Sequence, residues 1–161
     1  MNELKEIVCR YDMVCDNPSG VGMELYRMPE FFQQLKGMET DTMHLHVFYE
    51  IIWFQKGSGT HYVDFNQYAI APGTIIFISP GQIHSFDTKH DQEGYVLKIC
   101  AELFDDFVSL SCVTVQDKDS AALEMLIGAM QEELKKEDSL GHREAKLRWR
   151  FAEYSGFLLS C

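Results

Sequence analysis

Residues 44–86 read HLHVFYEIIWFQKGSGTHYVDFNQYAIAPGTIIFISPGQIHSF, a series of short apolar runs separated by turn-forming residues. The runs are rich in β-branched and aromatic side chains, which favour strands. Sequences such as Ala71-Pro72-Gly73 and Ser79-Pro80-Gly81 supply turns, and Gly57-Ser58-Gly59 between two runs favours a hairpin. Short apolar runs separated by turn residues continue from about residue 20 to 115. Such regular spacing of short strands is typical of a sandwich or barrel. The predicted strands are 47–55, 60–65, 74–78, 84–86 and 95–100.

Near residue 116 the spacing of the apolar residues changes to three and four, which predicts a helical segment. Leu123, Ile127, Met130 and Leu134 are spaced four, three and four residues apart, which places them on one face of a helix that Asp119 or Ser120 would cap. After a break at residues 139–141 the same spacing returns in Leu147, Phe151, Tyr154 and Leu158. Two antiparallel helices joined by a short turn are therefore expected. We divide the chain into a barrel with an N-terminal arm, 1–116, and a helical dimerisation segment of the same domain, 117–161.

The second predicted helix has two apolar stripes. Beside the first stripe of Leu147, Phe151, Tyr154 and Leu158 runs a second, made of Ala145, Trp149 and Ala152. Docking on a barrel needs one stripe, so the other would be exposed in a monomer. We predict a homodimer and assign the dimerisation contact to Leu147, Phe151, Tyr154 and Leu158. The alternative is that both stripes pack on the chain's own barrel and first helix.

Composition and charge argue against a nucleic-acid-binding, secreted or membrane-spanning chain. The chain has 161 residues, with 14 Lys and Arg against 25 Asp and Glu, a formal net charge of −11. This charge opposes binding to a phosphate backbone. The N-terminus shows no secretory signal, and no apolar run reaches the length of a membrane span. The five cysteines, an odd number without a CxxC spacing, indicate reduced thiols. We expect a cytoplasmic protein.

Three histidines and a glutamate form the chemically informative pattern. His44, His46 and Glu50 are all even-numbered, so on a strand they point to one face, and a second strand after Pro80-Gly81 could bring His84 opposite them. Such a set suits Fe(II), Mn(II), Ni(II) or Zn(II). It also suits the lining of an effector site, which we favour, with Tyr62 reaching the site beside His84, or plain structural hydrogen bonding. No Ser or Cys nucleophile accompanies the other histidines, so no hydrolase triad is assigned.

These motifs resemble two known patterns. The sequences HLHVFYE…G and G…PGQIH resemble the two motifs of the cupin superfamily, a small antiparallel β-barrel. The longer stretch from residue 44 to 86, followed by GYVLKI and a helical pair, resembles the N-terminal effector-binding and dimerisation domain of AraC-type transcriptional regulators. The resemblance implies a cupin-like barrel, two helices, and a separate C-terminal domain with helix-turn-helix units. Because the apolar face of the last helix continues to the end of the sequence, we expect that the chain is a fragment that lacks this DNA-binding domain.

The expected function is therefore that of a regulatory domain. The resemblance implies a small organic effector, such as a sugar or related metabolite, and no catalysis. From the residue pattern we expect this effector to be polar and to be bound by His44, His46, Glu50, Tyr62 and His84. DNA would be bound only through the missing C-terminal domain, and no membrane partner is expected. No cofactor is expected, although a divalent metal at His44, His46, Glu50 and His84 stays open. The alternative function is a metal-dependent cupin enzyme, a dioxygenase or an isomerase.

Overall fold

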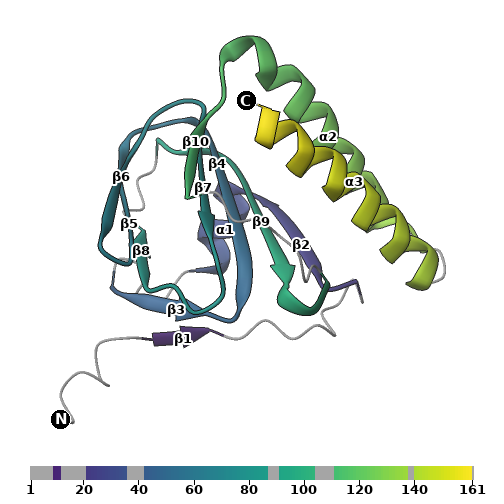
Figure 1. Ribbon diagram of the computed structural model, residues 1–161, viewed down its shortest axis with the longest axis horizontal. Coiled ribbons are helices and arrows are strands. Elements are labelled where there is room, and N and C mark those ends of the chain that lie inside the picture. The colour runs from purple at the N-terminus through teal and green to yellow at the C-terminus, as the bar shows by residue number, and fades with distance from the viewer. Residues whose placement is uncertain are drawn as a thin grey trace.

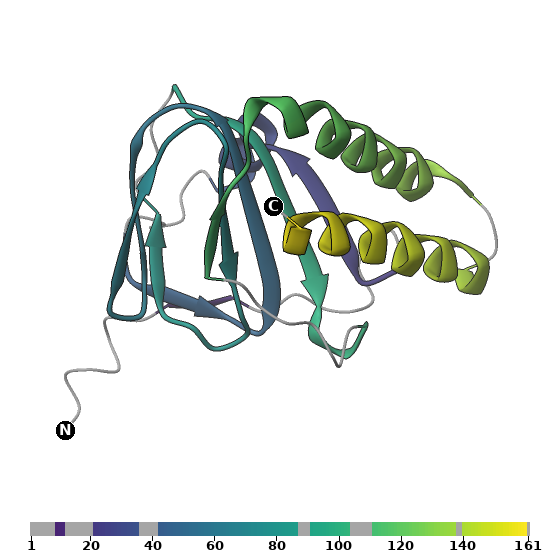
Figure 2. The same ribbon diagram turned by 45° about the horizontal axis from the view of Figure 1, so that its top comes forward.

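Two β-sheets face each other in the computed structural model, which describes residues 9–11, 21–35, 42–86, 91–103, 111–137 and 140–160. Each sheet has five strands, and two long helices lie against the outside of one sheet (Figure 1). Figure 2 shows the two layers of strands facing each other, with the helix pair to one side. The predicted fold class, a mainly β barrel followed by an antiparallel helix pair, is confirmed.

One sheet has shorter strands and is called the smaller sheet here. It carries most of the predicted histidines. Its strand order is β1-β3-β8-β5-β6, and all its pairs are antiparallel except β1 with β3, which is parallel. The strands are β1 (Cys9–Tyr11), β3 (His44–His46), β5 (Gly59–Val63), β6 (Asn66–Ile70) and β8 (His84–Phe86).

The larger sheet forms the centre of the molecule. Its order is β10-β7-β4-β9-β2, and every pair is antiparallel. The strands are β2 (Met23–Arg27), β4 (Phe48–Lys56), β7 (Thr74–Ile78), β9 (Glu93–Cys100) and β10 (Cys112–Thr114).

Strand β4 is covered on both faces, which explains its continuous apolar sequence. Ile52 and Phe54 belong to the core inside the barrel, whereas Ile51 and Trp53 belong to the core beneath the helices. Because successive side chains on a strand alternate between faces, the even-numbered residues of β4 face the barrel interior and the odd-numbered ones face the helices.

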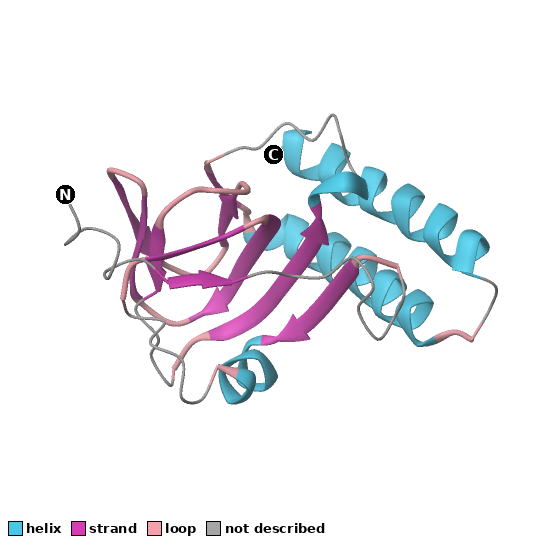
Figure 3. Ribbon diagram, turned by 90° about the horizontal axis from the view of Figure 1, so that it is seen from below, coloured by secondary structure: helices cyan, strands magenta, loops and turns pink. Residues whose placement is uncertain are grey.

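The helices are α1 (Met28–Gln34), α2 (Asp117–Lys135) and α3 (Leu140–Ser160), with a short 3₁₀ helix, η2 (Ala101–Leu103). Figure 3 shows the two long helices gathered on one side of the strands. Helix α2 starts two residues before the predicted cap, after Gln116, and no side-chain hydrogen bond caps it. Within the described part of the chain, no helix is both long enough and apolar enough to cross a membrane.

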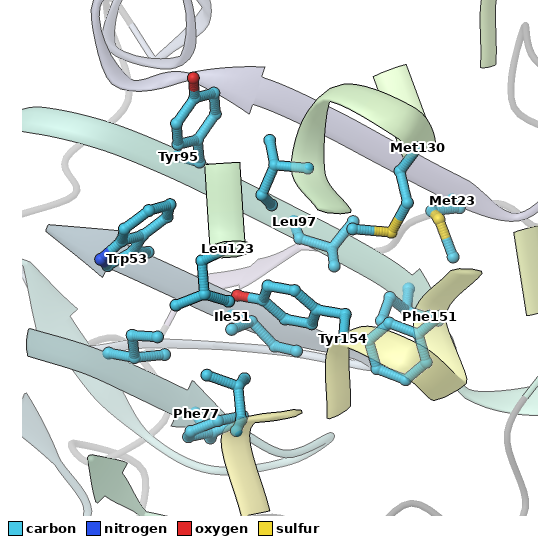
Figure 4. Close-up of a cluster of buried hydrophobic side chains, with 14 of the residues drawn as sticks. Met23, Ile51, Trp53, Phe77, Tyr95, Leu97, Leu123, Met130, Phe151 and Tyr154 are labelled. Carbon is cyan, nitrogen blue, oxygen red and sulfur yellow. The ribbon is translucent and has the colours of Figure 1, made fainter. Parts of the chain in front are cut away.

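A single apolar core joins the helix pair to the larger sheet. In Figure 4, Leu123 of α2 and Tyr154 of α3 point into the layer between helices and strands, where they meet Ile51. Phe151 and Trp53 lie in the same cluster. The helical stripe predicted from Leu123, Ile127, Met130 and Leu134 is thereby the docking face of α2.

The stripe assigned to dimerisation lies in this core instead. Leu147, Phe151, Tyr154 and Leu158 are each 1–2% exposed and pack in the cluster that joins the helices to the sheet. The assignment of a dimer contact to these four residues is therefore corrected, because they already bury their apolar surface within the chain. The neighbouring stripe is the exposed one, and Trp149 is 60% exposed.

Two local predictions are also corrected. Gly57-Ser58-Gly59 does not close a hairpin, because it joins β4 of the larger sheet to β5 of the smaller sheet and these strands do not pair. The hairpin is formed instead by β5 and β6 around Asp64 and Phe65, where Asp64 adopts a positive φ of 53°. Cys100 is disulfide-bonded, so the expectation of reduced thiols is wrong for this residue.

Candidate functional site

The predicted polar residues meet between the two sheets. His44 and His46 lie on β3, and His84 lies opposite His44 on the neighbouring strand β8. Glu50 lies on β4 of the facing sheet. The sequence argument placed His44, His46 and Glu50 on one strand, but the chain passes from one sheet to the other at Val47. The residues still converge, because the inner faces of the two sheets look toward each other.

Glu50 stands at the centre of this cluster. Its Oε2 atom lies 3.4 Å from His46 Nε2 and 3.9 Å from His84 Nε2. The ring of His84 lies 4.1 Å from that of His44 and 4.7 Å from that of His46, measured between centroids. All four side chains are buried. The predicted convergence of these four residues therefore matches the structure.

Backbone carbonyl groups orient three of the imidazole rings. The Nδ1 atoms of His44, His46 and His84 lie 3.0, 2.8 and 3.1 Å from the carbonyl oxygens of Thr42, Phe48 and Gln82, respectively. A carbonyl oxygen only accepts hydrogen bonds, so each Nδ1 carries the proton and donates. In the neutral ring Nε2 then has a free lone pair. The Nε2 atoms of His46 and His84 are the ring nitrogens that face Glu50.

Burial sets the charges of the cluster. Burial lowers the pKa of His44 and lowers that of His84 to about 4, so both rings are neutral at neutral pH. Burial alone would raise the pKa of Glu50, but the contacts with His46, His84 and Lys98 outweigh it and hold the pKa at about 2. The cluster therefore presents one carboxylate and the lone pairs of the neutral His44 and His84 rings, which accept hydrogen bonds or ligate cations.

His61 is a fifth member that the sequence analysis missed. It lies on β5 and is fully buried, and neither ring nitrogen has a hydrogen-bond partner within the part of the chain that the structure describes. Its ring is stacked on that of His84, with centroids 5.8 Å apart. Burial lowers its pKa to about 3, so the ring is neutral. The alternation along residues 59–63 could have indicated it, since His61 and Val63 share a face and Val63 is a core residue.

Tyr62 does not reach the site. It is 39% exposed, and both of its neighbours in β5, His61 and Val63, are buried. Alternation along the strand therefore directs Tyr62 to the outer face of the sheet. The predicted role of Tyr62 in the effector site is corrected, and the position belongs to His61.

Three of the four proposed metal ligands fit a metal ion. One ligand atom each from His46, Glu50 and His84 lies within 4.8 Å of the others, and all three residues are buried. Two imidazoles and a carboxylate are a common donor set for Fe(II), Mn(II), Ni(II) or Zn(II). Metal-ligating histidines usually donate their second ring N–H to a backbone carbonyl or carboxylate, as His46 and His84 do here. His44 packs against His84 but is not part of this converging set.

Comparison with known proteins links this arrangement to a family of binding domains. Residues 33–148 match the family model described as the AraC-like ligand binding domain. Among solved structures, the chain is similar to the AraC-like transcriptional activator CuxR, with 16% identity over 83% of this chain and 48% of that chain and a TM-score of 0.43. It is also similar to apo ToxT from Vibrio cholerae strain SCE256, with 15% identity over 84% of this chain and 53% of that chain and a TM-score of 0.43.

The chain is also similar to a barrel protein of another kind. This is a cupin 2 conserved barrel domain protein from Rhodopseudomonas palustris, with 16% identity over 70% of each chain and a TM-score of 0.34. The chain spans about half the length of the two AraC-type chains it matches, 48% and 53%. No curated protein matches it significantly.

The unpartnered ring of His61 predicts a pH-dependent loss of stability. Its folded pKa of about 3 lies below the ordinary value of 6.5, so the unfolded chain binds more protons and stability falls as the pH falls below 6.5. Between pH 7 and pH 5 this residue should account for a loss of about 2 kcal/mol in the free energy of unfolding. His61→Leu should remove that part of the loss, measured by urea unfolding at each pH. Tyr62→Leu on the outer face is the control, and an unchanged pH profile in His61→Leu would contradict the assignment.

Proposed function

The chain belongs to the AraC-like ligand-binding domain family, and from this premise we propose that it is the sensing domain of a transcriptional regulator, with a small polar effector bound between its two sheets. The observation that carries the proposal is a set of buried ring nitrogens that have no hydrogen-bond partner among the described residues: His46 Nε2, both nitrogens of His61, and His84 Nε2. Buried polar atoms without partners are costly, and native structures usually satisfy them with a ligand or water.

The chemistry of the cluster supports a ligand that donates hydrogen bonds. Glu50 and the Nε2 atoms of His46 and His84 are acceptors. Hydroxyl groups of a sugar or a related metabolite would supply the matching donors. His44 and His61 extend the polar surface along the smaller sheet. We assign no reaction to these residues, since a sensing domain has only to bind.

A divalent metal is the second candidate for the same cluster. The convergence of His46, Glu50 and His84 and the orientation of their rings support it. A bound ion would supply a Lewis acid to which effector oxygen atoms could bind. The same donor set is what a metal-dependent dioxygenase or isomerase of the cupin type would need, so this enzyme class remains the rival function.

We also propose a homodimer, formed by the exposed face of α3. The exposed residues along this face are Ala145, Trp149, Ala152, Gly156 and Leu159. Their spacing of four, three, four and three residues is that of a coiled-coil seam. Trp149 and Leu159 are 60% and 59% exposed, so the seam carries two large apolar side chains. A second copy of α3 in a two-fold arrangement would cover them.

Contact with DNA is assigned to a separate domain of the regulator. The formal net charge of −11 on this chain supports the assignment, because a protein binds a phosphate backbone mainly through an excess of Lys and Arg.

Effector binding is tested with a panel of sugars and polyhydroxy acids in thermal-shift assays, followed by calorimetric titration of any molecule that stabilises the chain. For such a molecule, Glu50→Gln and His84→Ala should each weaken binding at least tenfold, because each removes a buried acceptor. Tyr62→Phe, on the outer face of the same barrel, should bind normally. Undiminished binding in both site variants would place the effector elsewhere.

Metal binding is tested by elemental analysis of the purified chain and by titration of the apo form with Mn(II), Ni(II) and Zn(II). If the cluster is a metal site, the chain should bind close to one equivalent of metal. His46→Ala and Glu50→Gln should lower affinity by at least tenfold, whereas His61→Leu should retain the metal because His61 is outside the converging set. Retention in His46→Ala, or no metal uptake by the folded chain, would remove the metal candidate.

The dimer is tested by sedimentation equilibrium. Trp149→Glu places a charge in the proposed seam and should raise the dimer dissociation constant at least tenfold while the chain stays folded. Phe65→Glu is the matched control, since Phe65 is fully exposed at the tip of the β5–β6 hairpin, away from α3. Leu147→Glu should unfold the chain instead, because Leu147 lies in its core. A monomeric wild type, or a dimer unaffected by Trp149→Glu, would refute the seam.

A further inference from the structure

Lys98 is a cation on the inner side of the larger sheet, next to the histidine and glutamate cluster. It lies on β9 directly opposite Glu50 of β4, and paired residues of adjacent strands project to the same face. On its other side it pairs with Glu24 of β2. Val96, two residues earlier on β9, belongs to the core inside the barrel, which places Lys98 on that same inner face.

Three aromatic rings surround the ammonium group of Lys98. Its Nζ atom lies 5.0 Å from the ring centroid of Phe31, 5.4 Å from that of Phe48 and 5.6 Å from that of Tyr26. A cation over ring faces at such distances is attracted by them, and the rings restrict where it can lie. Phe48 is in turn stacked on His46, with centroids 4.0 Å apart. The frame around Lys98 is therefore continuous with the histidine cluster.

The hydrogen-bonding capacity of this ammonium group is unused by the described residues. Rings attract its charge but accept no conventional hydrogen bond, and no hydrogen bond or ion pair within 4.0 Å joins Nζ to a described side chain or carbonyl group. Its charge acts on Glu50 only at longer range, where it helps to lower the pKa of that carboxyl group. Three N–H donors of a half-buried cation are thus available for a ligand.

We propose that the effector carries a carboxylate group and that Lys98 binds it. This inference rests on the proposed sensing function and narrows its ligand to a small organic acid. Glu50 is ionised and the ring of His84 is neutral, so Lys98 supplies a positive charge beside this cluster. A carboxylate bound there could direct its hydroxyl groups toward Glu50 and the imidazoles.

The charges around Lys98 favour a monoanion. The single ammonium group lies beside Glu50 and Glu24 on its paired strands, and a dianionic phosphate would meet two carboxylates with one cation to balance them. A carboxylate adds one negative charge beside Lys98 where a dianion adds two, so it is repelled less by Glu50 and Glu24. The competing interpretation is that Lys98 serves only to balance the charge of Glu50.

The test compares acids with their uncharged amides. Glycolate, lactate, glycerate and benzoate, each paired with the corresponding amide, are assayed by thermal shift and calorimetry on the wild type, Lys98→Met and Lys56→Met. Lys56 is the matched control, because it is an exposed lysine that pairs with Glu93 outside the barrel. At least one acid should bind the wild type at least tenfold more tightly than its amide. That preference should be lost in Lys98→Met and kept in Lys56→Met and in Lys98→Arg.

The outcomes separate this inference from the proposed function. Three results would overturn the role of Lys98. Acids and amides could bind equally well, an acid could bind Lys98→Met as tightly as the wild type, or no acid could bind at all. If uncharged sugars then bind in a way that requires Glu50 and His84, the proposed sensing function stands without a role for Lys98. An acid whose binding depends on Lys98 but is unaffected by Glu50→Gln and His84→Ala would support Lys98 and count against the proposed effector cluster. Urea unfolding of Lys98→Met checks that the variant is folded in each assay.

Discussion

The larger sheet is buried on both faces, and the rest of the molecule depends on this constraint. Strand β4 lies at its centre, so alternate residues of β4 must satisfy two different environments. Ile51 and Trp53 meet the helix pair, whereas Ile52 and Phe54 fill the barrel. Glu50 follows the same alternation into the barrel, where a carboxylate needs polar neighbours. The histidines of the facing sheet provide them.

This arrangement also connects the candidate site to the helices. Glu50 faces the proposed effector, and the next residue, Ile51, lies in the core that holds Tyr154 and Phe151 of α3. The opposite face of α3 carries the exposed seam with Trp149. Effector site, sheet, core and proposed dimer surface are therefore consecutive layers, each in contact with the next. A shift of β4 on effector binding would act directly on the packing of α3, which is the kind of contiguous physical contact that coupling between two sites requires.

The chemistry of the cluster comes from details of the backbone. Three carbonyl oxygens hold the Nδ1 protons of His44, His46 and His84. This leaves lone pairs next to Glu50, a set of acceptors that attracts a cation or hydrogen-bond donors. Lys98 adds a cation at the margin of the same interior, within a frame of aromatic rings. A molecule with hydroxyl groups and one carboxylate would complement both parts.

The sequence by itself determined the class of fold, five of the ten described strands, the two long helices and the core of the candidate site. These features follow from local periods, since a repeat of two residues marks a strand face and spacings of three and four mark a helix face. Tertiary structure alone decided which face meets which partner. It placed Leu147 in the core and Trp149 outside, turned His61 inward and Tyr62 outward, and led Gly57-Ser58-Gly59 between sheets instead of into a hairpin. A periodic pattern defines faces only relative to one another, and their orientation is settled by packing between residues that are far apart in the chain.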